Sequence, residues 1–227
     1  MIRRLFTDIA GVYDRMNRLL SLGCDLRWRR QAAALVHGSP AAILDLACGT
    51  GDFAFALAQR FPDAQILGVD LTPAMLDLAR AKNTSSNITF RLGDAQNLSS
   101  LAASFEQPNN RTIEHSLVTC AFGFRNFPDK AAALAEAKRI MKPDGELLVL
   151  EFFRPPNRLI GALTGLWLRA MASLFARNNA AAYAYLRKSI EQTLSASEFI
   201  ALAQRQGFVL QARKLFLPGC SCLLFKS

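Results

Sequence analysis

Short apolar runs alternate with segments of helical spacing along most of the chain, and this alternation constrains the fold more than any other feature. Five runs rich in Ile, Leu and Val predict strands over 42–47, 65–70, 88–93, 116–122 and 146–153. Helical spacing between them predicts helices over 52–61, 73–82 and 129–141. Strands that are apolar throughout are typical of parallel sheets buried on both faces. The alternation therefore predicts an α/β domain with a mainly parallel sheet.

The C-terminal part is expected to extend this sheet in another way. Start and stop signals predict a helix over 195–208. Two strands, 209–216 and 220–226, would follow it as a hairpin added to the sheet edge. The polar stretch 99–115 is predicted to be a loop. We therefore expect a single domain over the 227 residues, with seven strands.

The stretch 45–53, with the sequence DLACGTGDF, lies between the first predicted strand and the first predicted helix. Gly49 and Gly51 allow the backbone to pass close to a ligand, and the start of a helix favours ligand oxygens. Asp70 ends the next strand, where a carboxylate can accept hydrogen bonds from both hydroxyls of a ribose. The glycine spacing also fits the loose dinucleotide fingerprint, so NAD must be weighed as a ligand at this point.

Further acids distinguish between the possible ligands. Asp45 can receive the ammonium of an amino-acid cofactor, whereas it would repel a pyrophosphate. Asp52 suits the start of a helix and does not invite a second anion. Asp94 and Ala95 follow the third predicted strand, where they can hydrogen-bond an adenine amino group. The ordered set favours S-adenosylmethionine, a sulfonium cation for which a carboxylate-lined pocket is the electrostatic complement.

The formal net charge of +9 favours anionic partners such as nucleic acid, acidic phospholipid or an anionic ligand, or it reflects a merely basic surface. No aromatic–basic RNA-binding motif is found, so no nucleic-acid partner is expected. Five scattered cysteines and two histidines predict neither a disulfide framework nor a metal site. Cys48 and Cys120 are expected to be small buried residues. No signal peptide and no membrane span are predicted.

One apolar stretch, 159–175, stands out because it contains Trp167 and Phe175. Basic residues surround it, namely Arg154, Arg158 and Arg177. An apolar helix beside basic residues is typical of an element that lies on a membrane surface. The alternatives are a helix that covers the sheet or a contact in a homodimer.

Several stretches resemble the quinone-biosynthesis C-methyltransferases, within the class I S-adenosylmethionine-dependent methyltransferases that share the DLACGTG loop. They are 13–28 (YDRMNRLLSLGCDLRW), 122–126 (FGFRN), 139–152 (RIMKPDGELLVLEF) and 182–190 (AYAYLRKSI). The resemblance implies a Rossmann-like, mainly parallel seven-stranded sheet with a C-terminal antiparallel hairpin. It also implies C-methylation of a quinol ring, with demethylmenaquinol to menaquinol as the expected reaction and a ubiquinol precursor as the related one. The alternatives are another small lipophilic acceptor, a cofactor-binding module without turnover, and a dehydrogenase.

The resemblance implies cofactor contacts for Thr50, Asp70, Asp94 and Ala95. The physical arguments add Asp45, Gly49 and Gly51, and we expect Leu71, Met75 and Ala121 beside them. Met75 would pack on the adenine or belong to an ordinary helix core. Ala121 stands where the family often has a serine at the cofactor site. Asp144 and Phe153 depart from the family as well, since they replace a usual glycine and a usual serine.

The polar end of AFGFRN (121–126) is expected to carry the chemistry, because the ends of parallel strands face the ligand crevice. Arg125 would stabilise a phenolate, and Asn126 would orient Arg125 or bond the second ring oxygen. The alternative is that Arg125 pairs with an acid such as Asp129 and caps the following helix. Phe122 and Phe124 are expected to be walls for an aromatic substrate.

The N-terminal region 1–37 is predicted to form a helical lid that brings Tyr13, Asn17 and Trp28 near the substrate. The region 155–192 is predicted to be a helical insertion that faces the substrate and the membrane, because an isoprenoid quinol resides in the bilayer. We therefore expect a cytoplasmic enzyme that associates peripherally with the inner face of the cytoplasmic membrane.

Overall fold

The computed structural model describes residues 2–99, 115–155, 157–175, 180–217 and 219–227. In these residues, seven strands form one sheet with the order β3-β2-β1-β4-β5-β7-β6. The strands are β1 (Ala42–Leu46), β2 (Gln65–Asp70), β3 (Ile88–Leu92), β4 (His115–Ala121), β5 (Met141–Phe152), β6 (Val209–Leu217) and β7 (Cys220–Lys226). Strands β1 to β5 pair in parallel, and β7 is antiparallel to both β5 and β6. The predicted fold class, with its C-terminal antiparallel hairpin, is confirmed.

Helices connect the strands and cover the sheet. They are α1 (Ile2–Leu20), α2 (Cys24–Ala33), α3 (Asp52–Arg60), α4 (Pro73–Lys82), α5 (Lys130–Arg139), α6 (Arg158–Phe175), α7 (Ala180–Gln192) and α8 (Ala196–Arg205). Their starts follow the sequence signals. Pro73 opens α4, and Asp129 accepts the Ala132 N–H at 2.9 Å at the start of α5. Ser195 and Glu198 form a capping box at the start of α8.

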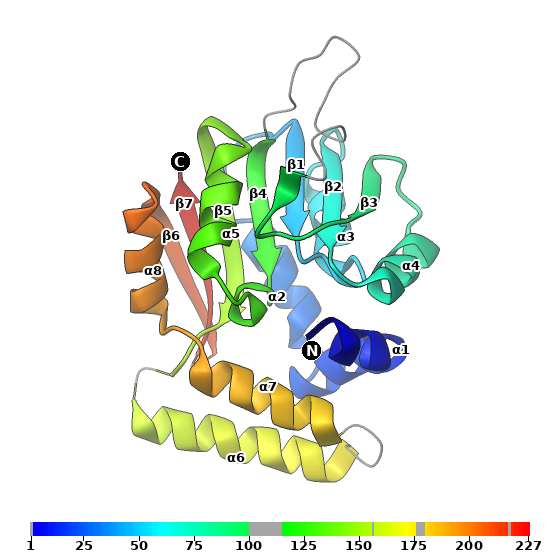
Figure 1. Ribbon diagram of the computed structural model, residues 1–227, viewed down its shortest axis with the longest axis vertical. Coiled ribbons are helices and arrows are strands. Elements are labelled where there is room, and N and C mark those ends of the chain that lie inside the picture. The colour runs from blue at the N-terminus through cyan, green and yellow to red at the C-terminus, as the bar shows by residue number, and fades with distance from the viewer. Residues whose placement is uncertain (1, 100–114, 156, 176–179, 218) are drawn as a thin grey trace.

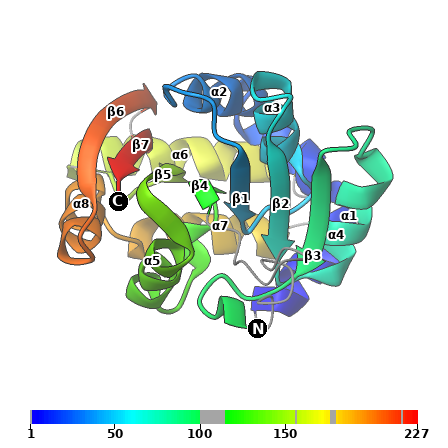
Figure 2. The ribbon, with the colours of Figure 1, turned by 90° about the horizontal axis from the view of Figure 1, so that it is seen from above.

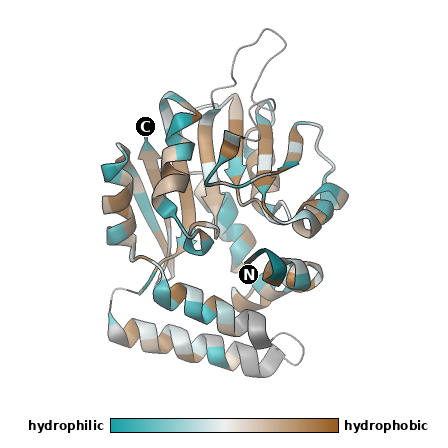
Figure 3. Ribbon diagram, in the orientation of Figure 1, coloured by the Kyte–Doolittle hydropathy of each residue, from teal (hydrophilic) through white to brown (hydrophobic). Residues whose placement is uncertain are grey.

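The sheet separates two apolar cores, one on each face. Trp28 of α2, Phe53 of α3 and Leu76 of α4 are buried in one core. Leu134 of α5 and Phe199 of α8 are buried in the other. The view from above shows α2 and α3 on one side of the strands and α5 and α8 on the opposite side (Figure 2). The strands are mainly hydrophobic along their length, as expected for a sheet covered on both faces (Figure 3).

Most strand bounds agree with the prediction to within one residue, but the start of β5 does not. β5 begins at Met141 rather than at 146, because the Pro-Asp-Gly segment belongs to the strand. Asp144 in this segment has a left-handed φ of 62°, which is the conformation that a glycine adopts freely. The usual glycine of the family therefore suits the backbone here, and Asp144 holds the same conformation while it pairs with Lys226 at 3.3 Å. The predicted loop 99–115 lies outside the described residues except at its two ends.

The carboxyl ends of the parallel strands face a layer of three helices. Figure 1 shows α1, α6 and α7 beyond this end of the sheet, with α6 and α7 side by side. Helix α6 packs against α7 and α1, so it does not cover the sheet. Strand order reverses between β1 and β4, and ligands of open α/β sheets bind at such a switch point. None of the described helices is long and apolar enough to cross a membrane.

Candidate active site

The glycine loop after β1 depends on three residues with left-handed backbone. Ala47 has a φ of 52°, Gly49 of 56° and Gly51 of 87°. A Cβ atom on Gly51 would lie 2.9 Å from the rings of Phe55 and Phe90, so this position requires glycine for space as well as conformation. Gly51 is the N-cap of α3 and supports the loop from behind.

Asp70 ties this loop to the end of β2. One carboxylate oxygen accepts the Gly49 N–H at 2.9 Å, and the other accepts the Thr72 N–H at 2.8 Å. Burial raises the pKa of Asp70, and these backbone hydrogen bonds counteract the rise. The carboxylate therefore has a fixed orientation at the strand ends, with lone pairs left for a ligand.

A cavity of about 330 Å³, here called the strand-end cavity, lies in front of Asp70. Seven of the residues predicted to contact the cofactor line it: Gly49, Asp70, Leu71, Met75, Asp94, Ala95 and Ala121. Tyr13, Phe122 and Asn126 line it as well. Met75 is also part of a core cluster beneath α1. Its position therefore fits both alternatives given for it, contact with the adenine and membership of a helix core. Gly51 is not among the lining residues.

A second, small cavity of about 20 Å³ adjoins the first. Tyr13, Ala47, Gly49 and Ala121 line both, and Asp45 and Thr50 line only the small one. Asp45 is fully buried, and one of its oxygens accepts the Thr119 hydroxyl at 2.7 Å. The other oxygen is buried without a hydrogen-bond partner. Burial raises the pKa of Asp45 to about 7.

The raised pKa predicts that Asp45 makes the free energy of unfolding depend on pH. The unfolded chain ionises Asp45 above its ordinary pKa of 3.8, whereas the folded protein keeps it protonated up to about pH 7. Its contribution to stability is therefore fully present below about pH 4 and is lost as the pH rises towards 7, by about 4 kcal/mol in total. Urea unfolding of wild type and Asp45→Asn between about pH 4 and about pH 8 would measure most of this loss. The variant should lack it, and parallel pH profiles would contradict the assignment.

A third cavity of about 380 Å³, here called the apolar cavity, lies beneath the helical layer. Its lining comes from α1, α2, α6 and α7 and includes Leu20, Trp28, Leu163, Trp167 and Ile190. Phe122 lines both this cavity and the strand-end cavity, so one ring separates the two. Phe122 has a left-handed φ of 62°, a conformation that is strained for a bulky residue and is found mainly at functional sites.

Arg125 reaches the apolar cavity from the same segment. Its Nη1 donates to the Glu151 carboxylate at 2.6 Å and to the Phe122 carbonyl at 2.7 Å. Burial disfavours the charged form of Arg125, but the Glu151 carboxylate outweighs this and raises its pKa. The alternative reading, in which Arg125 pairs with an acid, is therefore correct in kind, but the acid is Glu151 and not Asp129, which caps α5. The protein itself supplies the counter-ion of this arginine.

Two hydrogen-bond donors in the apolar cavity are buried without partners. They are Arg125 Nε and Asn17 Nδ2. Asn126 faces the strand-end cavity, and its amide oxygen accepts the Tyr185 hydroxyl at 3.0 Å. The apolar cavity thus combines large apolar walls with a few unpaired donors beside Phe122, as expected of a site for a hydrophobic ligand with oxygen atoms.

Phe124 does not reach either cavity, contrary to the prediction. It is 1% exposed and packs on Phe127 and Phe199 in the core. Strand β4 ends at Ala121, and the left-handed residue Phe122 then turns the chain into a short 3₁₀ segment. Residues two apart therefore no longer point to the same side, and only Phe122 faces the ligands.

Comparisons with known proteins identify the family of the chain. Residues 1–225 match the ubiE/COQ5 methyltransferase family. The demethylmenaquinone methyltransferase of Deinococcus radiodurans is 41% identical over 221 residues, covering 94% of this chain and 87% of that protein. The ubiquinone/menaquinone biosynthesis C-methyltransferase UbiE of Syntrophotalea carbinolica is 38% identical over 211 residues, covering 91% and 85%.

The chain belongs to the ubiE/COQ5 methyltransferase family. The fold agrees with a solved structure, human N-acetylserotonin methyltransferase in complex with S-adenosylmethionine, at a TM-score of 0.63 and 18% identity. That match covers 100% of this chain and 59% of the human one. This member of the ubiE/COQ5 family is accordingly an S-adenosylmethionine-dependent methyltransferase.

The cavities of this methyltransferase fit its cofactor. Asp70 would offer its fixed carboxylate to the ribose hydroxyls, and Met75 and Leu71, which line the same cavity, would offer apolar surface to adenine. The unpaired oxygen of Asp45 suits an ammonium group. Thr50 was predicted to contact the cofactor, but its hydroxyl already donates a hydrogen bond to Asp14 at 2.5 Å and cannot donate a second one to the cofactor. Ala121 lies between the two cofactor cavities, so the serine usual in the family would present its hydroxyl there.

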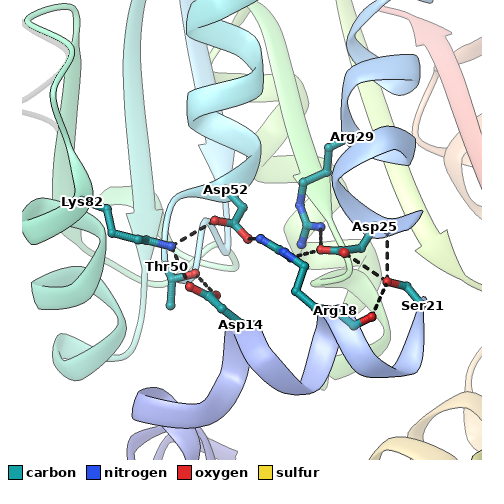
Figure 4. Close-up of polar contacts among 8 residues, drawn as sticks. All are labelled: Asp14, Arg18, Ser21, Asp25, Arg29, Thr50, Asp52 and Lys82. Atoms are coloured by element: carbon teal, nitrogen blue, oxygen red, sulfur yellow. Dashed lines mark hydrogen bonds and ion pairs between the residues drawn. The ribbon is translucent and has the colours of Figure 1, made fainter. Parts of the chain in front are cut away.

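An ion-pair network joins α1 of this ubiE/COQ5 member to the glycine loop (Figure 4). We call it the latch; it consists of Asp14, Arg18, Asp25, Asp52 and Lys82. Lys82 of α4 bridges Asp14 and Asp52 at 2.8 and 2.9 Å. Arg18 bridges Asp52 and Asp25. The latch holds α1, and with it Tyr13, against the small cavity.

The sequence reasoning missed Glu151, Tyr185, Arg29 and the latch. An acid inside the apolar run 146–153 was the available signal for Glu151, because a buried carboxylate requires a cationic partner. The resemblance covered Tyr185 without giving it a role. Arg29 and the latch depend on how the first two helices pack, and no local pattern indicates that. Among the described residues, no cluster of side chains suited to a metal ion is found.

Proposed function

We propose that this methyltransferase methylates a ring carbon of an isoprenoid hydroquinone, converting demethylmenaquinol to menaquinol. The observation that carries the proposal is the apolar cavity, which meets the cofactor side at Phe122 and holds two unpaired buried donors, Arg125 Nε and Asn17 Nδ2. A hydroquinone has an aromatic ring, an apolar tail and two oxygens, which match these features. The name of the relative from D. radiodurans favours a naphthoquinol over a benzoquinol.

The chemistry requires a nucleophilic ring carbon. When bound, S-adenosylmethionine supplies an electrophilic methyl group. Ionisation of a ring hydroxyl pushes electron density onto the neighbouring carbon, so a group that stabilises the phenolate accelerates the reaction. Arg125 can do this, because it stays charged in the cavity and Glu151 fixes its position.

Asn126 acts in this proposal by holding the reactive segment in place. Its amide nitrogen donates to the Phe122 carbonyl at 3.4 Å while its oxygen accepts the Tyr185 hydroxyl. Helix α7 is thereby connected to the residue that separates the two cavities. Phe122 packs on Phe152 with ring centroids 5.3 Å apart, which gives the ring of the acceptor a firm wall.

The test is methyl transfer by the purified protein to reduced demethylmenaquinol with a short isoprenoid tail. Mass spectrometry of the product should show one added methyl on a ring carbon. Methylation on oxygen, or transfer to a benzoquinol precursor in preference to the naphthoquinol, would overturn the assignment. A thermal shift with S-adenosylhomocysteine and none with NAD is the accompanying control for cofactor class.

We further propose that the exposed face of α6 rests on an anionic membrane surface, which would make the protein peripheral to the inner face of the cytoplasmic membrane. Leu159, Leu163 and Leu166 are 71%, 58% and 64% exposed, and Trp167 is 38% exposed. Leu163 and Trp167 also line the apolar cavity, so this face leads to the proposed acceptor site. Arg169 is exposed nearby, whereas Arg154 pairs with Glu198 and the Arg158 side chain and Arg177 lie outside the described residues.

Flotation with anionic liposomes at low salt should recover wild type with the vesicles. The double variant Leu159→Glu, Leu166→Glu should remain unbound, because charge on this face opposes insertion into the interface and neither residue lines the apolar cavity. Leu215→Glu is the matched control, since Leu215 is 62% exposed on β6. Equal flotation of the double variant and wild type would count against the membrane surface.

A further inference from the structure

Arg29 is a buried cation that the proposed chemistry does not use. It lies on α2, is 4% exposed, and lines the small cavity. Its Nη1 donates to Asp25 at 2.8 Å, and its guanidinium lies 5.1 Å from the centre of the Phe122 ring. Its Nε is buried and has no hydrogen-bond partner. A buried guanidinium with an unused donor is costly unless a ligand completes its hydrogen bonds.

The same cavity contains an acid that also has a buried polar atom without a partner. Asp45 lines it too, and one Asp45 oxygen is buried without a partner. Arg29 pairs with Asp25 rather than with Asp45, although its charge acts on Asp45 and lowers the pKa of that carboxyl against the larger effect of burial. The cavity therefore presents one carboxyl group, which an ammonium ion would favour in its ionised form, and one cationic donor; the two lie in the same cavity without pairing with each other.

A ligand that satisfies both groups must carry an ammonium and a carboxylate, as an α-amino acid does. The small cavity adjoins the strand-end cavity, since Tyr13, Ala47, Gly49 and Ala121 line both. A nucleoside in the strand-end cavity can therefore extend its amino-acid tail towards Asp45 and Arg29. Asp52 also lines the small cavity, but Arg18 and Lys82 already compensate its charge.

We propose that Arg29 binds the carboxylate of the methionyl tail of S-adenosylmethionine, opposite Asp45, which binds its ammonium. The proposal rests on the cofactor and not on the identity of the acceptor. Arg29 would thereby bind the cofactor directly, whereas the N-terminal region 1–37 that contains it was expected to act only as a lid. The pair would select ligands that have a complete amino-acid group.

The test compares the dissociation constants of three ligands by calorimetry: S-adenosylhomocysteine, its decarboxylated analogue and 5′-methylthioadenosine. Wild type should bind S-adenosylhomocysteine about 10- to 100-fold more tightly than the decarboxylated analogue, the usual range for a hydrogen bond to a charged group. In Arg29→Gln this preference should fall to within about 3-fold. Affinity for 5′-methylthioadenosine, which has no amino-acid group, should stay unchanged.

Asp45→Asn provides the mirror result. A fourth ligand, the deaminated analogue of S-adenosylhomocysteine, is added for this variant. Asp45→Asn should lose discrimination against the deaminated analogue and keep discrimination against the decarboxylated one. Arg30→Gln is the matched control, because Arg30 is the exposed neighbour on the same helix. If Arg29→Gln proves unstable, Arg29→Lys takes its place. It keeps the positive charge and should retain part of the preference for S-adenosylhomocysteine over the decarboxylated analogue.

Two outcomes would overturn the proposal. One is equal weakening of all three ligands in Arg29→Gln, which would indicate a structural role through Asp25 and Phe122. The other is equal affinity of wild type for S-adenosylhomocysteine and its decarboxylated analogue. Neither binding experiment requires a quinol. Their outcome is therefore independent of the methyl-transfer assay that tests the proposed acceptor.

Discussion

Arg125→Ala is expected to abolish methyl transfer and to lower the free energy of unfolding by about 3–5 kcal/mol. The stability loss follows from Glu151, which is 1% exposed and would be left as an uncompensated buried carboxylate. The Phe122 carbonyl would lose the shorter of its two side-chain hydrogen bonds at the same time and keep the one from Asn126. The loss of turnover follows from the missing phenolate-stabilising cation, while affinity for S-adenosylhomocysteine should stay within a few-fold of wild type.

The double variant Arg125→Ala, Glu151→Ala separates these two effects. Removing both charges eliminates the unpaired carboxylate, so urea unfolding should show that much of the stability returns. Turnover should remain absent, since the cation is still missing. If the double variant recovered turnover together with stability, Arg125 would be no more than the counter-ion of Glu151.

Asp70→Ala is expected to weaken S-adenosylhomocysteine binding by about 100-fold or more, because two hydrogen bonds from ribose hydroxyls to a charged group are worth about 1.5–3 kcal/mol each. The same change removes the acceptor for the Gly49 and Thr72 N–H groups and loosens the glycine loop. Calorimetry would measure the affinities. A loss smaller than about 5-fold would contradict the assignment of Asp70 to the ribose.

The ligand panel distinguishes Asp70 from Arg29. Asp70→Ala should weaken 5′-methylthioadenosine as much as S-adenosylhomocysteine, because both ligands contain the ribose. Asp77→Ala is the control on the neighbouring helix, where Asp77 is exposed and pairs only with Arg80 at 3.1 Å. Surface pairs of this kind contribute little, so this variant should bind like wild type.

Local patterns sufficed to predict the sheet, the helix starts and the glycine loop. The β2 strand and the α4 helix have the predicted bounds, because Pro73 and the neighbouring apolar runs act over a few residues. Asp70, which ends β2, and Asp94, which follows β3, could also be assigned to one ligand site from the sequence. Parallel strands bring their carboxyl ends to one edge of the sheet, so sequence order translates directly into proximity there.

Pairings across strands and helices could not be predicted in this way. Glu151 meets Arg125 because the parallel register of β4 and β5 sets Ala121 beside Leu150, so the next residues lie at the same edge. Asp129 is closer to Arg125 in the sequence than Glu151 is, but its carboxylate caps the start of α5. Phe122 and Phe124 were treated as equivalent because they are two residues apart, and the left-handed backbone at Phe122 breaks that equivalence.

The ring of Phe122 has a consequence for the order of events in a catalytic cycle. Each side of this partition has exposed residues of its own in its wall, Leu71 at the strand-end cavity and Leu22 and Leu163 at the apolar cavity. We infer that the nucleoside and the proposed hydrophobic acceptor enter and leave on different sides of Phe122. In the proposed function, neither ligand would have to wait for the other to depart, and spent nucleoside would be exchanged from the water while the protein stays at the proposed membrane surface.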